Sequence, residues 1–424
     1  MHFCDLCGII ECDFSRKDFP YMKYLVLIPD GMADVKIEQL ANRTPMQAAN
    51  KPTMDALAKK SLVGTVSNVP EGMVPESDTA NMAILSFDPK VYSKGHSPLE
   101  AMSMGLEMQP DETAYRCNVV TLTEEGDYDD KIILDHSADE ITTAEADELI
   151  KALEATLGNE NRHFYTGVSY RHCLLWKNGN DKYPFMRPHD ILGKEIKEYL
   201  PKAENGGAEF YELMRKSYDI LNHHPVNEAR RARGLKPANS AWLWSPGKKP
   251  QLPNFKEKWG LDAAVISAVD LIKGIGICAG MKSIDVEGAT GNVHTNYKGK
   301  ADAAIKAFAD GYDYVYIHVE APDECGHRAE IENKVLSIEK IDTEILAPVL
   351  SYLKGCGEDY RVMVLPDHPT PIFMRTHTSD PVPFLIYDSQ KDANGVSTFC
   401  EDTATATGYY VADGYRLMEL LTKK

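Results

Sequence analysis

Short apolar runs alternate along this chain with segments whose apolar positions follow helical periodicity. Apolar runs bounded by turn residues are typical of buried strands. Four such runs stand at Tyr24–Ile28, Tyr312–Val319, Arg361–Leu365 and Phe384–Tyr387. Helical patterns cover Thr53–Ser61, Asn81–Leu85, Ala301–Ala309 and Lys334–Leu353, the last one broken at Pro348. Strands that alternate with helices predict an α/β fold, in which helices flank a mostly parallel sheet.

The middle of the chain has a different composition. From about Asp111 to Asn254 it is more polar and contains clusters of Gly, Asn and Pro. A chain of 424 residues is also too long for one ordinary core. We therefore predict two domains, of which the second is an α+β domain inserted into the first. The first comprises residues 22–110 and 255–424, the second residues 111–254, and the return linker is Pro246–Pro253.

Residues 1–21 precede the first predicted strand and show no periodic apolar face. Cys4, Cys7 and Cys12 lie there with His2, a combination that can bind zinc. One CxxC without a second pair at suitable spacing is weak evidence for a metal site, however. Acidic residues also interrupt any apolar core of a signal peptide. We expect a loosely ordered N-terminal extension whose cysteines are incidental.

The overall charge excludes several classes of partner. A formal net charge of −18 repels nucleic acid and anionic lipid. No apolar run approaches the roughly 20 residues that span a bilayer. The six cysteines outside the extension stand among apolar neighbours, which is typical of reduced, mostly buried thiols in a cytoplasmic enzyme. An anionic substrate would need local cations, such as bound metals and a few arginines. The oligomeric state is not indicated.

Side chains that bind metals follow three of the predicted strands directly. Asp30 follows the first strand, Glu320 and Asp323 follow the second, and Asp367 and His368 follow the third. A single Asp after a strand is usually a turn or cap residue. Ligand sites in open α/β sheets, however, gather at the carboxyl ends of strands. Metal-binding side chains after three strands therefore predict a metal site at one edge of the sheet.

Histidines refine this prediction. The Asp323-x-x-x-His327 spacing places two ligand types one helical turn apart, so that both can face one point. Asp367 and His368 are adjacent and can diverge toward two neighbouring metals, and His377 lies in a loop before the fourth strand. Carboxylates mixed with imidazoles suit manganese, zinc or iron better than calcium. Two metals about 3.5–4 Å apart could clamp a transferring phosphoryl group.

Ser77 is the candidate nucleophile. It stands in VPESDTANMAIL, where a loop-like segment precedes a predicted helix. One interpretation is an ordinary serine that caps the helix. The other is a nucleophile at a helix N-terminus, where free backbone N–H groups and the helix dipole favour a phosphate. A neutral serine needs a base or a metal to become reactive, so its position alone does not decide between the two.

An ordered set of motifs is similar to a known family. The set runs from Met22 to the C-terminus and comprises DGMAD at Asp30, SDTAN with FDP after it, RCNVVT, GVSYRH, PAN with WLW, KGIG, GATGNVHTNY, EAPDECGH, DHPTP and HTSDPVP. It resembles the archaeal-type cofactor-independent phosphoglycerate mutases, members of the alkaline phosphatase superfamily. The resemblance implies interconversion of 3-phosphoglycerate and 2-phosphoglycerate, in glycolysis or gluconeogenesis, through a phosphoserine at Ser77. It implies no 2,3-bisphosphoglycerate cofactor.

The resemblance also implies roles for individual residues. Two divalent metals are expected, manganese first, with magnesium or zinc as alternatives. One metal would be held by Asp30, Ser77, Asp367 and His368, and the other by Asp323, His327 and His377. The inserted domain would bind the substrate with basic side chains. The candidates are Arg116, Arg171 and Arg230, followed by Arg233 and Lys273.

Some segments depart from the family pattern. Asn81 stands where archaeal mutases usually have His, and LDHSADEI, LSFDP and YSKGHSP replace more usual segments. These changes lie near substrate-handling segments and not at the seven metal-site positions. They leave open a phosphotransferase acting on another small alcohol, such as the proposed homoserine kinase of a bacterial branch, and a phosphatase with the same nucleophile. The absence of a P-loop motif disfavours a kinase. A metal-binding protein without catalysis is the remaining alternative.

Overall fold

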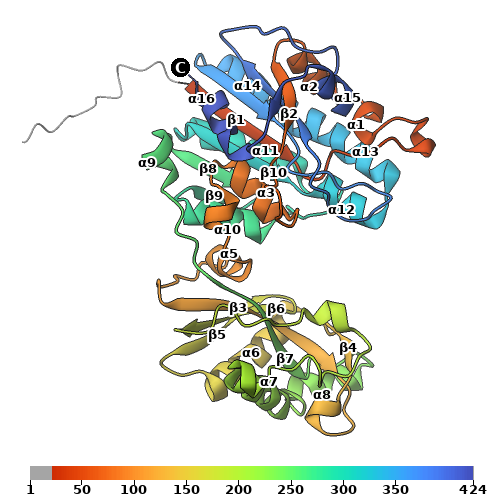
Figure 1. Ribbon diagram of the computed structural model, residues 1–424, viewed down its shortest axis with the longest axis vertical. Helices are drawn as coiled ribbons and strands as arrows, with labels where there is room; N and C mark the ends of the chain where they lie inside the picture. Colours follow the sequence, from red (N-terminus) through yellow and green to blue (C-terminus); the bar gives the residue numbers. More distant parts are fainter. Residues whose placement is uncertain (1–21, 424) are drawn as a thin grey trace, which may run out of the picture.

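The computed structural model describes residues 22–423 and contains two groups of elements (Figure 1). The larger group is built on an eight-stranded sheet. Its strands, in spatial order, are β13 (Tyr410–Val411), β2 (Leu62–Val66), β12 (Val382–Asp388), β11 (Asp359–Val364), β1 (Met22–Pro29), β10 (Tyr314–Val319), β8 (Ala263–Ile266) and β9 (Lys282–Ile284). Only β12 runs antiparallel to its neighbours. The predicted α/β fold with a mostly parallel sheet is confirmed, whereas the predicted N-terminal extension lies outside the described residues.

Both faces of this sheet are covered by helices. Alternate residues of β1 belong to two different apolar clusters, Leu25 and Leu27 to one, Val26 and Ile28 to the other. This explains why β1 is a continuous apolar run and not an alternating one. The first face is covered by α2 (Pro52–Ala58), α11 (Tyr297–Ala309), α13 (Ile331–Lys340), α14 (Ala347–Gly355) and α15 (Glu401–Ala406). The second is covered by α3 (Ser77–Ile84), α9 (Phe255–Trp259), α10 (Asp270–Cys278) and α16 (Leu417–Thr422).

The helix predicted over Lys334–Leu353 has three parts. A π-helical segment, Ile341–Leu346, separates α13 from α14. Pro348 causes no break: it comes directly after the wider π-helical turn, and Leu346 and Ala347 before it keep helical backbone angles. The π-helical segment instead aims buried Asp342 at the start of α2, where its carboxylate accepts hydrogen bonds from the N–H groups of Thr53 (3.0 Å) and Met54 (2.7 Å).

The smaller group has an antiparallel sheet centred on β3 (Glu112–Leu122). Helices α6 (Thr143–Leu157) and α7 (Ala208–Leu221) cover one face, with α8 (Pro225–Ala232) beside them. On the other face lies α5 (Ser97–Ser103), which also contacts α10 of the larger group. The remaining strands are β4 (Ile133–Asp135), β5 (Arg162–Val168), β6 (Arg171–Lys177) and β7 (Ser240–Lys248). We propose that the two groups are the two domains expected from the sequence.

The predicted return linker, Pro246–Pro253, is partly a strand. β7 extends to Lys248 and pairs with β3, so only the residues after it connect the two groups. Pro246 fits there because β7, as far as the described chain shows, pairs on one side only, and an edge strand tolerates a missing donor. No helix within residues 22–423 is long and apolar enough to cross a membrane.

Candidate active site

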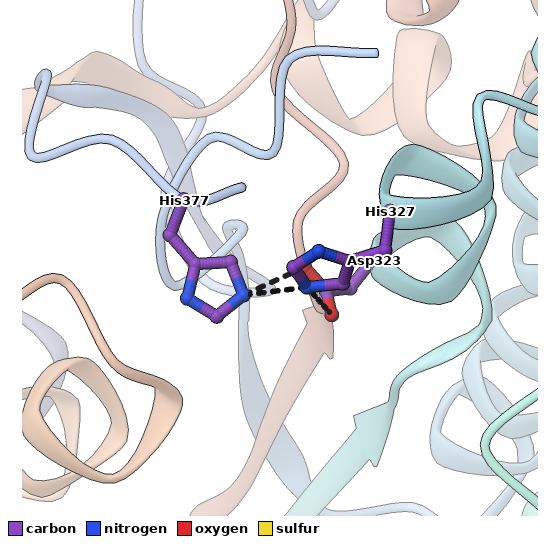
Figure 2. Close-up of side chains that lie close together, drawn as sticks. All are labelled: Asp323, His327 and His377. Carbon is purple, nitrogen blue, oxygen red and sulfur yellow. Dashed lines mark hydrogen bonds and ion pairs between the residues drawn. The ribbon is translucent and has the colours of Figure 1, made fainter. Parts of the chain in front are cut away.

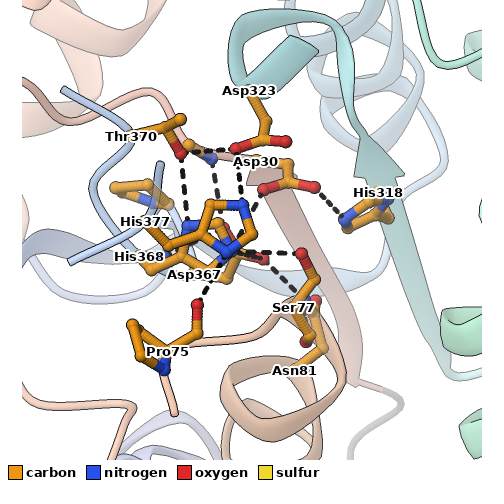
Figure 3. Close-up of polar contacts among 12 residues, drawn as sticks. Asp30, Pro75, Ser77, Asn81, His318, Asp323, Asp367, His368, Thr370 and His377 are labelled. Atoms are coloured by element: carbon orange, nitrogen blue, oxygen red, sulfur yellow. Dashed lines mark hydrogen bonds and ion pairs between the residues drawn. The ribbon is translucent and has the colours of Figure 1, made fainter. Parts of the chain in front are cut away.

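Neighbouring strands deliver the candidate ligands to one end of the large sheet. Asp30 directly follows β1, and Asp323 lies in α12 (Ala321–Arg328), which follows β10. Asp367 and His368 come shortly after β11. Since β1 lies between β10 and β11 and is parallel to both, their carboxyl ends meet at the same edge. Figure 3 shows these side chains pointing toward one another.

Four of the predicted residues form a first cluster around His368. Its Nε2 lies 3.7 Å from Asp30 Oδ1 and 3.5 Å from Asp367 Oδ2. Ser77 Oγ lies 3.1 Å from the same nitrogen. Ser77 is the first residue of α3, and Glu76 occupies the N-cap position. Ser77 is therefore not the N-cap residue, and its hydroxyl faces the cluster.

The three remaining predicted ligands form a second cluster (Figure 2). Asp323 Oδ2 lies 3.1 Å from His327 Nε2, and Asp323 Oδ1 lies 3.2 Å from His377 Nε2. The Nδ1 atoms lie within hydrogen-bond distance of backbone oxygens, 3.0 Å from Arg375 O for His327 and 2.7 Å from Pro75 O for His377. A metal-binding histidine is commonly oriented in this way, which leaves Nε2 for the ion.

The two clusters adjoin each other. The His368 and His377 rings stack with their centroids 3.9 Å apart. Potential ligand atoms of Asp30, Asp323 and His368 all lie within 4.8 Å of one another. The carboxylates and imidazoles thus form one continuous group, which the Ser77 hydroxyl contacts at His368.

The electrostatics of this group fit bound divalent cations. Burial, together with the nearby carboxylates of Asp367 and Asp323, holds the pKa of Asp30 well above its usual range. Asp30 Oδ1 is buried and accepts no hydrogen bond from any described residue. Burial and the charge of Asp323 raise the pKa of Glu320 to about 7. A cation would compensate this crowded negative charge and supply the missing partner of Asp30, as metal sites with mixed carboxylate and imidazole ligands do.

The sequence analysis did not assign two residues to this site: it did not name His318, and it placed Asn81 near the substrate-handling segments, whereas Asn81 contacts the candidate metal ligand Asp367. His318 lies within β10 and is fully buried; its Nε2 is 3.0 Å from Asp30 Oδ2 and its Nδ1 is 3.2 Å from Ser267 Oγ. Asn81 donates from Nδ2 to Asp367 Oδ2 (2.7 Å) and to Ser77 O (2.8 Å). A histidine inside an otherwise apolar strand was a usable signal for the first. The contact of Asn81 could not be read from the sequence.

Asn81 orients Asp367 as part of a buried chain. The hydroxyl of Tyr316 donates to Asn81 Oδ1, and Asn81 donates to one oxygen of Asp367. The other oxygen of Asp367 accepts from the N–H groups of Gly31 (3.1 Å) and His368 (2.9 Å). Three donors thus fix this carboxylate.

A buried ion pair supports the loop that carries His368 and His377. Lys334 Nζ lies 2.8 Å from Asp34 Oδ2 and donates to Thr370 O at 2.8 Å. Neither side chain of the ion pair is exposed. The hydroxyl of Thr370 in turn donates to Asp323 Oδ1. The ion pair is thereby linked to the second cluster.

Three of the predicted basic residues lie at or near the contact between the two groups of elements. Arg116 and Arg171 line a cavity between β3, β6 and α5, which also includes Glu100 and Asp270. Arg116 donates to Glu100 Oε2 at 2.6 Å and stacks on the ring of Trp244, 4.6 Å from its centroid. Lys273, on α10, pairs with Asp285 at 2.8 Å.

Arg230 and Arg233 lie elsewhere. Both guanidinium groups pair with the carboxylate of Glu145 on α6. Arg230 is 2% exposed and also donates to the backbone oxygens of Ala138 (2.6 Å) and Lys236 (2.9 Å). These contacts occupy the guanidinium of Arg230 in holding the inserted group together, and neither Arg230 nor Arg233 lines the cavity that contains Arg116 and Arg171.

Comparisons with known proteins identify the family. A family model described as 2,3-bisphosphoglycerate-independent phosphoglycerate mutase matches residues 58–227. A Geobacter sulfurreducens protein named as a probable enzyme of this kind is 46% identical over 401 residues, which cover 94% of this chain and 99% of that protein. This chain belongs to the 2,3-bisphosphoglycerate-independent phosphoglycerate mutases. Another member of the family, from Methanosarcina barkeri, is 46% identical over 404 residues, 95% of this chain and 100% of its own length.

Solved structures agree with the family assignment. The cofactor-independent phosphoglycerate mutase of Thermoplasma acidophilum is 26% identical with a TM-score of 0.64, covering 95% of this chain and 99% of its own. A Pyrococcus horikoshii protein, also 26% identical, has a TM-score of 0.79 and covers 95% and 97%. The resemblance inferred from the ordered motifs is therefore confirmed.

Proposed function

We propose that this enzyme interconverts 3-phosphoglycerate and 2-phosphoglycerate through a phosphoserine at Ser77. The observation that carries the proposal is the position of the Ser77 hydroxyl, at the start of an eight-residue helix and 3.1 Å from His368 in a cluster of buried carboxylates and imidazoles. Family membership supplies the substrate, since the relatives are named as phosphoglycerate mutases.

Two divalent cations, manganese first, are the proposed cofactors. Asp30, Ser77, Asp367 and His368 would hold one, and Asp323, His327 and His377 the other. Bound there, they would neutralise the phosphate and favour the deprotonated form of the serine. Seven protein groups over two ions leave positions for phosphate oxygens.

The chain's own residues define the proposed reaction. The N–H groups at the start of α3 would bind phosphate oxygens, and Arg116 and Arg171 would bind the phosphate and carboxylate by bidentate contacts. Ser77 attacks phosphorus and glycerate is released but held. Glycerate turns, and its 2-hydroxyl takes the phosphate back. Contact between the two groups of elements must exclude water during this step, because water would hydrolyse the phosphoserine.

A coupled assay tests the proposal. The protein is supplied in parallel with 3-phosphoglycerate, with ATP plus homoserine, and with p-nitrophenyl phosphate, before and after chelation and manganese addition. We expect 2-phosphoglycerate formation, lost on chelation and restored by manganese. Turnover of homoserine alone would favour the phosphotransferase alternative, and hydrolysis alone would favour the phosphatase.

Two variants and one control test the second metal cluster. Asp323→Asn and His377→Ala should each lower the bound metal and cut the rate steeply, because either change removes a ligand from the second cluster. His163→Ala alters a half-exposed histidine that pairs with Glu154, and it should change neither quantity. Active wild-type protein without any transition metal or magnesium would contradict the two-metal proposal.

A further inference from the structure

A histidine–carboxylate pair adjoins the nucleophile but belongs to neither metal cluster. Asp78 follows Ser77 directly and is 2% exposed. Its Oδ1 lies 3.2 Å from Nε2 of His96, which also lies 3.6 Å from Oε2 of Glu76. The two carboxylates that flank Ser77 in the sequence therefore converge on one nitrogen of one imidazole.

His96 is held by one nitrogen only. Among residues 22–423, no group hydrogen-bonds its Nδ1, and its side chain is 18% exposed. Burial opposes a charged ring, but the hydrogen bond and charge of Asp78 outweigh burial and raise the pKa of His96. Nε2 of His96 therefore lies against the Asp78 carboxylate, and Nδ1 is left for another partner.

His96 also lies where the two groups of elements meet. It precedes α5, whose Ser97 donates to Ser245 O of β7. The charged groups around it are Glu76 and Asp78, from the larger group of elements, and Arg116, from β3 of the inserted group. Arg187, from the inserted group, reaches Glu76 at 3.8 Å. A substrate held between Ser77 and the arginines would therefore lie next to this imidazole.

The proposed reaction needs a proton donor that the metal clusters do not supply. When Ser77 takes the phosphate, the oxygen of glycerate leaves as a poor leaving group unless it is protonated. When the phosphate returns, the 2-hydroxyl must lose a proton. A positioned acid–base group typically contributes about 10²–10⁴-fold to such steps.

We propose that His96, positioned by Asp78, is this acid–base residue; the inference rests on the proposed function. In the first half, Ser77 Oγ, whose proton has left to solvent, bonds to phosphorus. The bond from phosphorus to O3 breaks, and O3 keeps the electron pair and takes the Nδ1 proton of His96. In the second half, neutral His96 takes the proton of the 2-hydroxyl at Nδ1. O2 then bonds to phosphorus, and the electron pair of the broken bond returns to Ser77 Oγ.

The nature of the leaving group provides the test. His96→Asn should reduce mutase turnover by about 10²-fold or more. Hydrolysis of p-nitrophenyl phosphate should stay within about threefold, because p-nitrophenolate leaves without protonation. Asp78→Asn should also lower mutase turnover more than p-nitrophenyl phosphate hydrolysis, but by a smaller factor. Added imidazole should restore part of the mutase rate of His96→Ala. Manganese content should match the wild type, and His163→Asn is the control.

Several results would overturn the inference. Mutase turnover of His96→Asn within tenfold of wild type would do so. An equal fall in mutase turnover and in p-nitrophenyl phosphate hydrolysis would also do so, if imidazole in addition failed to rescue His96→Ala. A third equivalent of manganese in the wild type that His96→Asn loses would make Glu76, Asp78 and His96 a cation site instead. A last outcome separates the two proposals. If the wild type lacks mutase turnover, and His96→Asn loses hydrolysis of β-glycerophosphate but keeps hydrolysis of p-nitrophenyl phosphate, the proposed function is contradicted and the role of His96 is supported.

Discussion

At the scale of single residues, Ser77 is distinguished by a hydroxyl that does not cap the helix it begins. A serine at the start of a helix usually caps it, yet the N-cap position of α3 belongs to Glu76, whose side chain makes no capping hydrogen bond. The Ser77 hydroxyl therefore contributes little to the helix and faces His368 instead. Removing it should affect chemistry far more than folding.

Ser77→Ala is accordingly expected to lose more than about 10³-fold in turnover, as the loss of a nucleophile does. Its melting temperature should stay within a few degrees of wild type. Steady-state kinetics and thermal unfolding on the same preparation check both expectations. A variant that kept a rate within tenfold of wild type would show that Ser77 is not the nucleophile.

Asn81→Leu should weaken metal binding without removing a ligand. Leucine has a similar size but cannot donate to Asp367 Oδ2, and Tyr316 loses its acceptor. Partners that orient metal ligands typically contribute 10–100-fold in affinity, and the unpaired groups should cost about 1–3 kcal/mol of stability. Calorimetric titration with manganese measures the first quantity and denaturant unfolding the second. Unchanged affinity would contradict the orienting role.

The metal-free protein should lose stability as the pH rises from about 6.5 to 9. The hydrogen bond and charge of Asp323 raise the pKa of His327 to about 9, above the value of about 6.5 for an unfolded histidine. Between these two pH values the folded state binds more protons than the unfolded state. The contribution of protonated His327 to stability is therefore complete below about pH 6.5 and is lost as the pH rises to about 9. Melting temperatures of chelated wild type and His327→Gln should converge toward pH 9. Parallel pH curves would refute this assignment.

At the scale of elements, the sequence predicted strands better than it predicted the site's supports. Buried strands were recognisable because β1, β10 and β11 are covered on both faces, which requires continuous apolar runs. Five of the seven candidate ligands, Asp30, Asp323, His327, Asp367 and His368, could be named because they follow those strands or lie one helical turn from a residue that does. Ser77, at a helix start, and His377, in a loop, were assigned to the metals from the family resemblance. The sequence analysis did not predict the supporting roles of Asn81, His318 and the pair Asp34–Lys334, because each of these acts through a partner distant in the sequence. Asp34 and Lys334, for instance, are separated by most of the larger group's sequence and meet only in the fold.

The buried pair can be tested as a support of the site. Lys334→Met leaves the Asp34 carboxylate buried without its cation, which typically costs about 3–5 kcal/mol. Lys298→Met removes a comparable pair on the surface, with Asp302, and should change stability by less than about 1 kcal/mol. Denaturant unfolding of the two variants gives the comparison. Equal losses would mean that burial of the pair is unimportant.

At the scale of the whole molecule, all seven candidate metal ligands lie in the larger group of elements, while the inserted group contributes none. A cation that binds one folded unit stabilises that unit by mass action. Calorimetry in manganese and in chelator should therefore show that chelation lowers one unfolding transition and leaves a second one, from the inserted group, in place. A single transition that shifts as a whole would show that the two groups unfold together.

The pairing of β3 with β7 has a consequence for how the chain is joined. These strands begin and end the inserted group, and Thr113 lies opposite Lys248 in their register. The chain therefore enters and leaves the inserted group at adjacent points, through two short connections that lie side by side. Rotation in a few backbone torsions of these two connections would move the inserted group relative to the larger one without breaking strand pairs in either sheet, although it would have to open the contact between α5 and α10.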